Sequence, residues 1–153
     1  MSLNGVSTEL DAEPTDLLLD VVRRAGCTGV KEGCWIGVCG ACTVIVDGLP
    51  VSSCLYMAGC AAGADVWTVE GLTARDPRLV DAFAEAGAIQ CGFCTPGQVT
   101  LAWWLANREA KRNGVPKATT DVDDVTDLMA GNLCRCTGYQ AIRKAVDTYR
   151  AGH

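Results

Sequence analysis

The pattern of apolar and polar residues divides the chain into two halves. In the first half, short β-branched or apolar runs alternate with turn residues, which is typical of β-strands. Asp47-Gly48, between two such runs, is a strong signal for a tight hairpin. We expect strands near residues 3–5, 7–10, 43–46, 49–53 and 66–69.

One helix is predicted between these strands. Positions 17, 18, 21 and 22 are apolar and recur at helical spacing, shortly after Pro14, which marks the end of the preceding strand. Thr15 or Asp16 is placed to cap the N-terminus of this helix. A mixed sheet packed around one helix is the β-grasp arrangement, which we expect for residues 1–72.

The second half has helical periodicity, and the pattern changes between Gly71 and Pro77. We expect helices near residues 78–87, 96–111, 121–131 and 138–150. Trp103 and Trp104 lie on the second of these helices and are expected in the core or at an interface. The predicted fold class is therefore α+β, with the β-grasp domain followed by a four-helix bundle over residues 73–153.

Length and charge argue against several classes of protein. The 153 residues fit one or two small domains but no large catalytic cavity. The net charge is −5 without a basic stripe, which argues against a nucleic-acid partner. No apolar run approaches the roughly 20 residues of a membrane helix, and the N-terminus carries no visible secretion signal. The only histidine is His153, which removes Ser-His-Asp triads, Cys-His nucleophiles and HExxH zinc sites from consideration.

Cysteine spacing carries the strongest chemical signal. Eight of the ten cysteines fall into two sets of four. The first set reads C-x4-C-x2-C with a fourth cysteine after eleven further residues, which is the ligand pattern of a plant-type 2Fe–2S cluster. The second set is a C-x2-C pair closed much later by C-x-C. The candidate metal ligands are Cys34, Cys39, Cys42 and Cys54 in the first set and Cys91, Cys94, Cys134 and Cys136 in the second.

The residues around both sets suit negatively charged clusters. Gly33, Gly37 and Gly40 thread the first loop, where glycine lets backbone amides turn toward sulfur. Cys94 and Cys136 are each followed by Thr-x-x-Gln, the capping-box pattern. We therefore expect two helices to begin directly after two ligands, with their N-terminal amides facing the second cluster.

Other chemistry for the cysteines stays open to different degrees. Four thiolates also suit zinc, but the spacing of the first set argues strongly against it and leaves it open only for the second set. The metal-like spacings, without a signal peptide, favour ligation in the reducing cytosol over disulfides. Cys27 and Cys60 fall outside both sets and are expected to be buried free cysteines.

Four stretches occur in a specific order along the chain: residues 28–34 (TGVKEGC), 39–44 (CGACTV), 90–97 (QCGFCTPG) and 131–139 (GNLCRCTGY). Together they resemble the small iron–sulfur subunit of the xanthine oxidase family of molybdenum hydroxylases, over nearly the whole chain. The resemblance adds Gln90 and Gly92, beside the second set, to the glycines of the first loop as cofactor-binding residues. Arg135, between two ligands, is placed to screen the charge of the cluster or to meet an acidic group of a cofactor.

The resemblance implies a plant-ferredoxin-like domain and a four-helix domain, each with one 2Fe–2S cluster. A large partner subunit would hold the molybdenum–pterin cofactor, and a medium subunit would hold FAD. The second cluster would lie nearer the pterin, and the first would relay electrons toward flavin. Substrate chemistry would take place on the large subunit, so this chain would contribute no catalytic residue. We expect a cytoplasmic dimer of heterotrimers.

Three features depart from the family pattern. Trp35 follows the first ligand where relatives carry a small or acidic residue, and its indole is expected to shield the cluster from water. The gap between Cys94 and Cys134 is longer than expected, and residues 107–120 are predicted to absorb it. The first ferredoxin strand is short, which implies a short sheet edge or a start further upstream.

A free-standing two-cluster ferredoxin is the alternative function. Such a carrier should have a mostly polar surface, whereas a built-in subunit buries large patches. The composition is 49% hydrophobic and 20% charged, which mildly favours the subunit.

Overall fold

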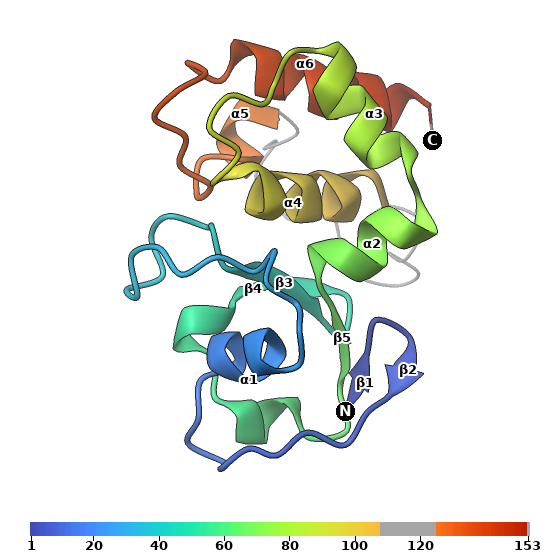
Figure 1. Ribbon diagram of the computed structural model, residues 1–153. Helices are drawn as coiled ribbons and strands as arrows, with labels where there is room; N and C mark the ends of the chain where they lie inside the picture. Colours follow the sequence, from blue (N-terminus) through green and yellow to red (C-terminus); the bar gives the residue numbers. More distant parts are fainter. Residues whose placement is uncertain (108–124, 153) are drawn as a thin grey trace, which may run out of the picture.

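The computed structural model describes residues 1–107 and 125–152 (Figure 1). The strands are β1 (Ser2–Leu3), β2 (Val6–Ser7), β3 (Thr43–Val46), β4 (Leu49–Ser52) and β5 (Asp65–Trp67). The helices are α1 (Leu18–Arg24), α2 (Val69–Arg75), α3 (Arg78–Glu85), α4 (Thr95–Asn107), α5 (Val125–Leu128) and α6 (Gln140–Ala151), with 3-10 turns at Ser53–Leu55 and Ala58–Ala61. No helix among these described residues has the length and apolar character to cross a membrane.

The five strands form one mixed sheet in the order β2-β1-β5-β3-β4. The pair β1–β5 is parallel, and the other neighbouring strands are antiparallel. Asp47 and Gly48 join β3 to β4 with φ angles of +48° and +83°. Two consecutive residues with positive φ define the tight turn that matches the twist of a hairpin, so the predicted hairpin is confirmed.

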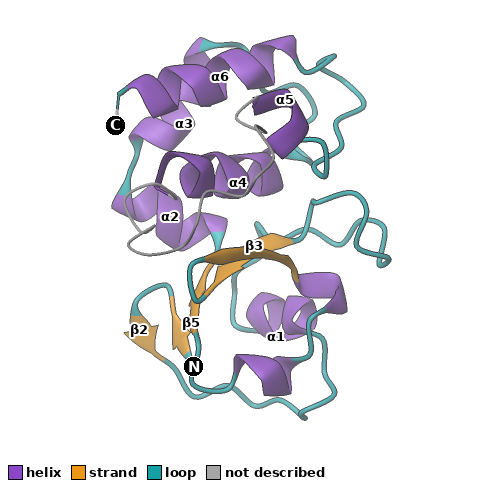
Figure 2. Ribbon diagram, turned by 180° about the vertical axis from the view of Figure 1, so that it is seen from behind, coloured by secondary structure: helices purple, strands orange, loops and turns teal. Residues whose placement is uncertain are grey.

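Strand β3 is buried on both faces because it lies between α1 and α4 (Figure 2). Val44 and Val46 pack in one core with the apolar face of α1. Ile45, which points the other way, belongs to the core of the helical half. The indole Nε1 of Trp104 on α4 donates to the Gly48 carbonyl at 3.0 Å, and Trp103 is buried. The expected core or interface position of this tryptophan pair is confirmed.

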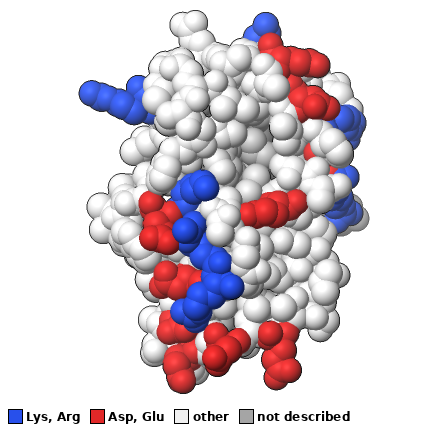
Figure 3. Space-filling model, in the orientation of Figure 1, with Lys and Arg blue, Asp and Glu red and all other residues white. Residues whose placement is uncertain are grey.

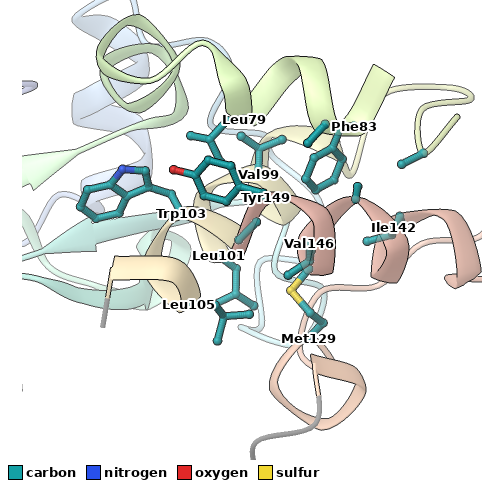
Figure 4. Packing of buried hydrophobic residues seen from close by; sticks show 14 of the residues in the cluster. Leu79, Phe83, Val99, Leu101, Trp103, Leu105, Met129, Ile142, Val146 and Tyr149 are labelled. Atoms are coloured by element: carbon teal, nitrogen blue, oxygen red, sulfur yellow. The ribbon is translucent and has the colours of Figure 1, made fainter. Parts of the chain in front are cut away.

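Helix α4 is the centre of the helical half, and it packs against α2, α3 and α6. Figure 4 shows the apolar side chains of these helices converging on α4 and α6. The side chains labelled in that view are Leu79, Phe83, Val99, Leu101, Trp103, Leu105, Met129, Ile142, Val146 and Tyr149. The predicted helices 78–87, 96–111, 121–131 and 138–150 correspond to α3, α4, α5 and α6, but positions 108–124 lie outside the described residues. The loop predicted to absorb the longer cysteine gap also falls largely there.

Helix α2 was not predicted, and the expected last strand is too long. β5 ends at Trp67, and α2 begins at Val69. Thr68 is buried between them, and its backbone N–H donates to Asn4 Oδ1 at 2.8 Å. Gly71 suggests a break in the sequence, yet it lies inside α2, where a Cβ atom would overlap the Asn4 side chain. A contact between distant segments therefore determines this part of the chain.

The predicted cap of the first helix is also wrong. α1 begins at Leu18 after the N-cap residue Leu17, which makes no side-chain cap. The Leu18 N–H donates instead to the Tyr56 carbonyl at 2.7 Å. Asp16, one of the two expected caps, pairs with Arg24 at 2.6 Å. A tertiary contact thus satisfies the amide that a cap would have served.

Candidate metal centres

The first set of cysteines lies where one loop and one turn meet beside the hairpin. Cys34 and Cys39 are on the loop that precedes β3, Cys42 directly precedes β3, and Cys54 is in the 3-10 turn after β4. The Ser53 hydroxyl donates to the Cys42 carbonyl at 2.7 Å, which ties the turn to the loop. The antiparallel pairing of β3 and β4 thus brings the fourth cysteine back to the first three.

Interactions among the four thiols show that they lie together. Backbone N–H groups, above all that of Ile36, lower the pKa of Cys34 to about 6, with further donors at Cys39 and Val38. Burial is the main cause that raises the pKa of Cys54 to about 11, and the neighbouring Cys42 and Cys34 add to it. The site therefore combines inward-pointing amides with crowded sulfur atoms, as a thiolate-bound anionic centre requires.

The three predicted glycines of this loop differ in what they do. Gly37 and Gly40 have φ angles of +73° and +68°, which favour glycine. Gly33 does not, but a Cβ there would lie 2.9 Å from the Cys39 sulfur. Gly33 therefore leaves room beside the sulfur, whereas Gly37 and Gly40 turn the backbone.

The second set lies at the approaches to α4 and α6. Cys91 and Cys94 precede α4, and their partners lie on the loop between α5 and α6. The sulfur atoms of Cys136 and Cys91 are 3.5 Å apart. The Thr137 hydroxyl donates to the Cys134 sulfur at 3.2 Å. The two motifs, far apart in the sequence, are thus brought to one place.

The pKa values of the second set describe a similar environment. Burial is the main cause that raises the pKa of Cys94 to about 12, and the neighbouring Cys134 and Cys91 add to it. Burial also acts to raise the pKa of Cys134, but the Thr137 hydroxyl and the backbone amides of Thr137 and Cys136 outweigh it and lower the value to about 7. Each set thus contains one thiol that hydrogen-bond donors shift toward its anionic form.

The helix starts agree with the prediction only in part. α4 begins at Thr95, directly after Cys94, but the Gln98 side chain points to the Asn132 carbonyl instead of closing a capping box. α6 begins at Gln140, three residues later than the pattern suggests. The Thr137 hydroxyl donates to the Cys134 sulfur, and its oxygen accepts a hydrogen bond from the Tyr139 N–H at 3.2 Å, so Thr137 orders the loop before α6 rather than the helix itself.

Tyr139 occupies the position before α6 with a φ angle of +68°. Its hydroxyl accepts a hydrogen bond from the Cys134 N–H at 2.7 Å, so it fixes the backbone of the second site. No role for Tyr139 was predicted from the sequence. The signal available was its place in the stretch 131–139.

The two sites are in direct backbone contact. The Leu133 N–H donates to the Cys39 carbonyl at 2.9 Å, and Leu133 immediately precedes Cys134. A Cβ on Gly97, near the start of α4, would overlap the Gly40 carbonyl oxygen. The loop of the first site is thus packed without a gap against two segments of the second.

The other predicted residues lie on the rims. Gln90 and Arg135 are exposed, and Gly92 has a φ angle of +81°. Trp35 has a φ angle of +59° and is 42% exposed. The expectation for Cys27, which is buried, is confirmed.

Cys60 is exposed, so the expectation of a buried side chain is wrong. Cys60 lies in the 3-10 turn Ala58–Ala61, in which the first and last residues, both alanines, are the buried ones. All ten cysteines lie in the described residues, and none forms a disulfide.

The donor sets fit 2Fe–2S clusters. Each site gathers four thiols with N–H or O–H donors directed at sulfur, and small residues surround the first site closely. Within the described ranges, no group of three or more His, Cys, Asp or Glu side chains is arranged to hold a single metal ion.

Two family models cover most of the chain. Residues 1–64 match the family described as "2Fe-2S iron-sulfur cluster binding domain", and residues 68–147 match the "[2Fe-2S] binding domain". The sheet-forming part is thus ferredoxin-like, and a helical 2Fe–2S-binding domain follows it.

Similar proteins include subunits of several dehydrogenases. The "Nicotinate dehydrogenase small FeS subunit" of Eubacterium barkeri is 44% identical, over 95% of this chain and 90% of its own length. The "Xanthine dehydrogenase iron-sulfur-binding subunit" of Escherichia coli O157:H7 is 43% identical, over 95% and 89%.

Solved structures extend the comparison to the fold. A chain of quinoline 2-oxidoreductase from Pseudomonas putida 86 is 42% identical with a TM-score of 0.81, and the match covers 99% of this chain and 91% of that one. Aldehyde oxidoreductase from Desulfovibrio gigas is 38% identical with a TM-score of 0.84, over 98% of this chain and 16% of that much longer one.

Proposed function

The chain belongs to the small iron–sulfur subunits of the xanthine oxidase family of molybdenum hydroxylases, and we propose that it is the electron-transfer subunit of such an enzyme. It would carry electrons from a molybdenum–pterin centre on a large subunit to FAD on a medium subunit. The observation that carries the proposal is the contact between two four-cysteine sites through Leu133 N–H and the Cys39 carbonyl.

We assign one 2Fe–2S cluster to each set of cysteines. Cys34, Cys39, Cys42 and Cys54 would hold the cluster of the ferredoxin-like domain. Cys91, Cys94, Cys134 and Cys136 would hold the cluster of the helical domain, nearer the pterin. Each cluster supplies a site that gains and loses single electrons.

The chain's own residues hold and insulate these sites. The amides of Ile36, Val38 and Cys39 and the hydroxyl of Thr137 donate toward sulfur, which stabilises negative charge at the ligands. Gly33 allows the approach of the Cys39 sulfur. Gln90, Gly92 and Arg135 would line the second cluster, although their contacts with it stay a prediction.

The surface favours a built-in subunit over a free-standing ferredoxin. Large apolar side chains are exposed beside both sites, with Ile36 at 66% and Leu133 at 51%. The others near the sites are Trp35, Val38, Leu55 and Phe93. In Figure 3 the projection at the middle of the left edge is white, and charged side chains lie above, below and beside it. Such apolar rims are typical of surfaces that another protein covers.

The finer features of the assembly are part of the proposal. The first domain, over residues 1–72, would be a β-grasp, and the second, over residues 73–153, would be a four-helix bundle. The complete enzyme would be a dimer of heterotrimers in the cytoplasm. Substrate chemistry would stay on the large subunit.

A native pull-down with metal and flavin analysis tests this function. We expect co-purifying large and medium subunits, about four iron atoms per molybdenum, and one FAD per molybdenum. Iron on an unaccompanied chain would instead support the free-standing ferredoxin and overturn the proposed partners. Zinc without iron would overturn both functions.

A further inference from the structure

A buried polar contact joins the two cysteine sites. Asn132 is 5% exposed, although its side chain is an amide. Its Nδ2 donates to the Gly40 carbonyl at 3.2 Å and lies 3.5 Å from the Thr43 hydroxyl oxygen. The Thr43 hydroxyl itself donates to the same Gly40 carbonyl at 2.7 Å. Asn132 thus connects the loop before Cys134 to the loop between Cys39 and Cys42.

Gln98 holds Asn132 from the other side. Its side chain is fully buried, and its Nε2 donates to the Asn132 backbone carbonyl at 2.5 Å. The Gln98 Oε1 has no hydrogen-bond partner among the described residues. A buried acceptor without a partner is destabilising, and an apolar residue here would avoid that cost. The position therefore uses glutamine for the hydrogen bond that it donates to Asn132.

The two segments pack so closely that Gly40 has no room for a side chain. A Cβ on Gly40 would lie 2.5 Å from Asn132 Cγ and 2.6 Å from the Gly131 carbonyl oxygen. The residue after Asn132 is Leu133, whose N–H donates to the Cys39 carbonyl. The Asn132 contact and the link from Cys39 to Cys134 are therefore adjacent and share one backbone.

We propose that Asn132, held by Gln98, is a positioning residue for electron transfer between the two sites. It keeps the loops in register, so that the hydrogen bond from Leu133 to the Cys39 carbonyl stays closed. This inference rests on the proposed function, because it concerns electrons that pass between two bound clusters. Neither residue touches a cluster ligand through its side chain in the contacts described above.

The test compares variants of the iron-loaded protein. Asn132→Ala removes the donor to Gly40, and Gln98→Met removes the donor to Asn132 while keeping an apolar side chain of similar length. Thr100→Val is the matched control, because it removes a buried hydroxyl from the same helix that donates within α4 to the Pro96 carbonyl. Iron content and the separate electron paramagnetic resonance signals establish that each variant holds both clusters.

Two readouts report the coupling. In the wild type with both clusters reduced, we expect magnetic interaction to split or broaden the two resonance signals. Asn132→Ala should lose this interaction and slow electron equilibration between the clusters after rapid photoreduction. Gln98→Met should act in the same direction but less strongly, because Asn132 keeps its bond to Gly40. Thr100→Val should match the wild type in both readouts.

The outcomes separate this inference from the function on which it rests. A wild type without two distinguishable 2Fe–2S signals would overturn the proposed function. A wild type with coupled clusters, and variants that keep the same splitting and rate, would overturn the role of Asn132 alone. If Asn132→Ala loses iron, the test moves to Gln98→Met, in which backbone hydrogen exchange of residues 131–134 is measured. Faster exchange together with weaker coupling supports the inference. Unchanged exchange and unchanged coupling overturn it.

Discussion

Replacing Gly97 with alanine tests the contact between the two loops. Two opposing effects decide whether this substitution stabilises or destabilises the protein. In an ordinary helix, Gly→Ala is stabilising by up to about 1 kcal/mol. Near the start of α4, however, the new Cβ would overlap the Gly40 carbonyl oxygen and lie 3.1 Å from the carbonyl carbon. That oxygen is held in place by the N–H and hydroxyl of Thr43 and by the amide of Asn132.

The clash should exceed the gain in helix propensity. Inserting a methyl group into a packed site costs about 1–3 kcal/mol, and the upper half of that range applies because the neighbour is backbone. After the helix gain is subtracted, the expected net loss is about 1–2 kcal/mol. For a chain of this size, that loss lowers the Tm by roughly 2–8 °C.

Thermal unfolding of the iron-loaded protein, followed by circular dichroism at a fixed scan rate, measures this loss. Gly131→Ala is the matched control, because a Cβ there meets nothing within 4 Å. The control should stay close to the wild type. A Gly97→Ala protein that is as stable as the wild type, with unchanged cluster signals, would refute the close packing of these loops.

Three further results are expected. Cys136→Ser should damage the cluster signal of the helical domain and leave the plant-type signal, as electron paramagnetic resonance can show. Tyr149→Phe removes the hydroxyl that donates to Asp76 at 2.9 Å and should cost about 1–2 kcal/mol, whereas Tyr56→Phe, which loses a 3.5 Å bond at the surface, should be nearly neutral in the same thermal assay. Burial, together with Asp76, raises the pKa of Tyr149, so its bond stabilises the fold below about pH 10 and is lost only as the pH rises further. An alkaline absorbance titration should therefore show one late-ionising tyrosine in the wild type that Tyr149→Phe lacks.

The features that the sequence predicted are those that neighbouring residues determine. The Asp47-Gly48 turn needs only two residues that tolerate positive φ, and the structure has them there. The order β3–β4 follows from that turn. The first three cysteines of the first set could be grouped because C-x4-C-x2-C is a local spacing, whereas the second set joins two motifs that are far apart in the sequence.

The features that sequence reasoning missed depend on distant partners. The N-terminus of α1 is satisfied by the Tyr56 carbonyl, not by a local cap. Gln98 fits a capping box by its spacing, yet it is drawn inward by Asn132, 34 residues away. Gly71 lies inside α2, where the absence of a side chain leaves room for Asn4. Each of these outcomes required knowledge of which segments meet.

The contact between the sites also implies that the two cysteines of the C-x-C pair are not equivalent. Cys134 directly follows Leu133, whose N–H donates to the Cys39 carbonyl in the first site. The Cys134 sulfur accepts a hydrogen bond from the Thr137 hydroxyl. Cys136 is exposed, and its sulfur lies beside Cys91, within the second site. Loss of the Cys136 ligand should therefore stay local, whereas Cys134→Ser should also disturb the loop that carries Cys39. If the two serine variants affect the first cluster equally, the coupling between the sites does not run through Leu133, because only one of the two substitutions is adjacent to it.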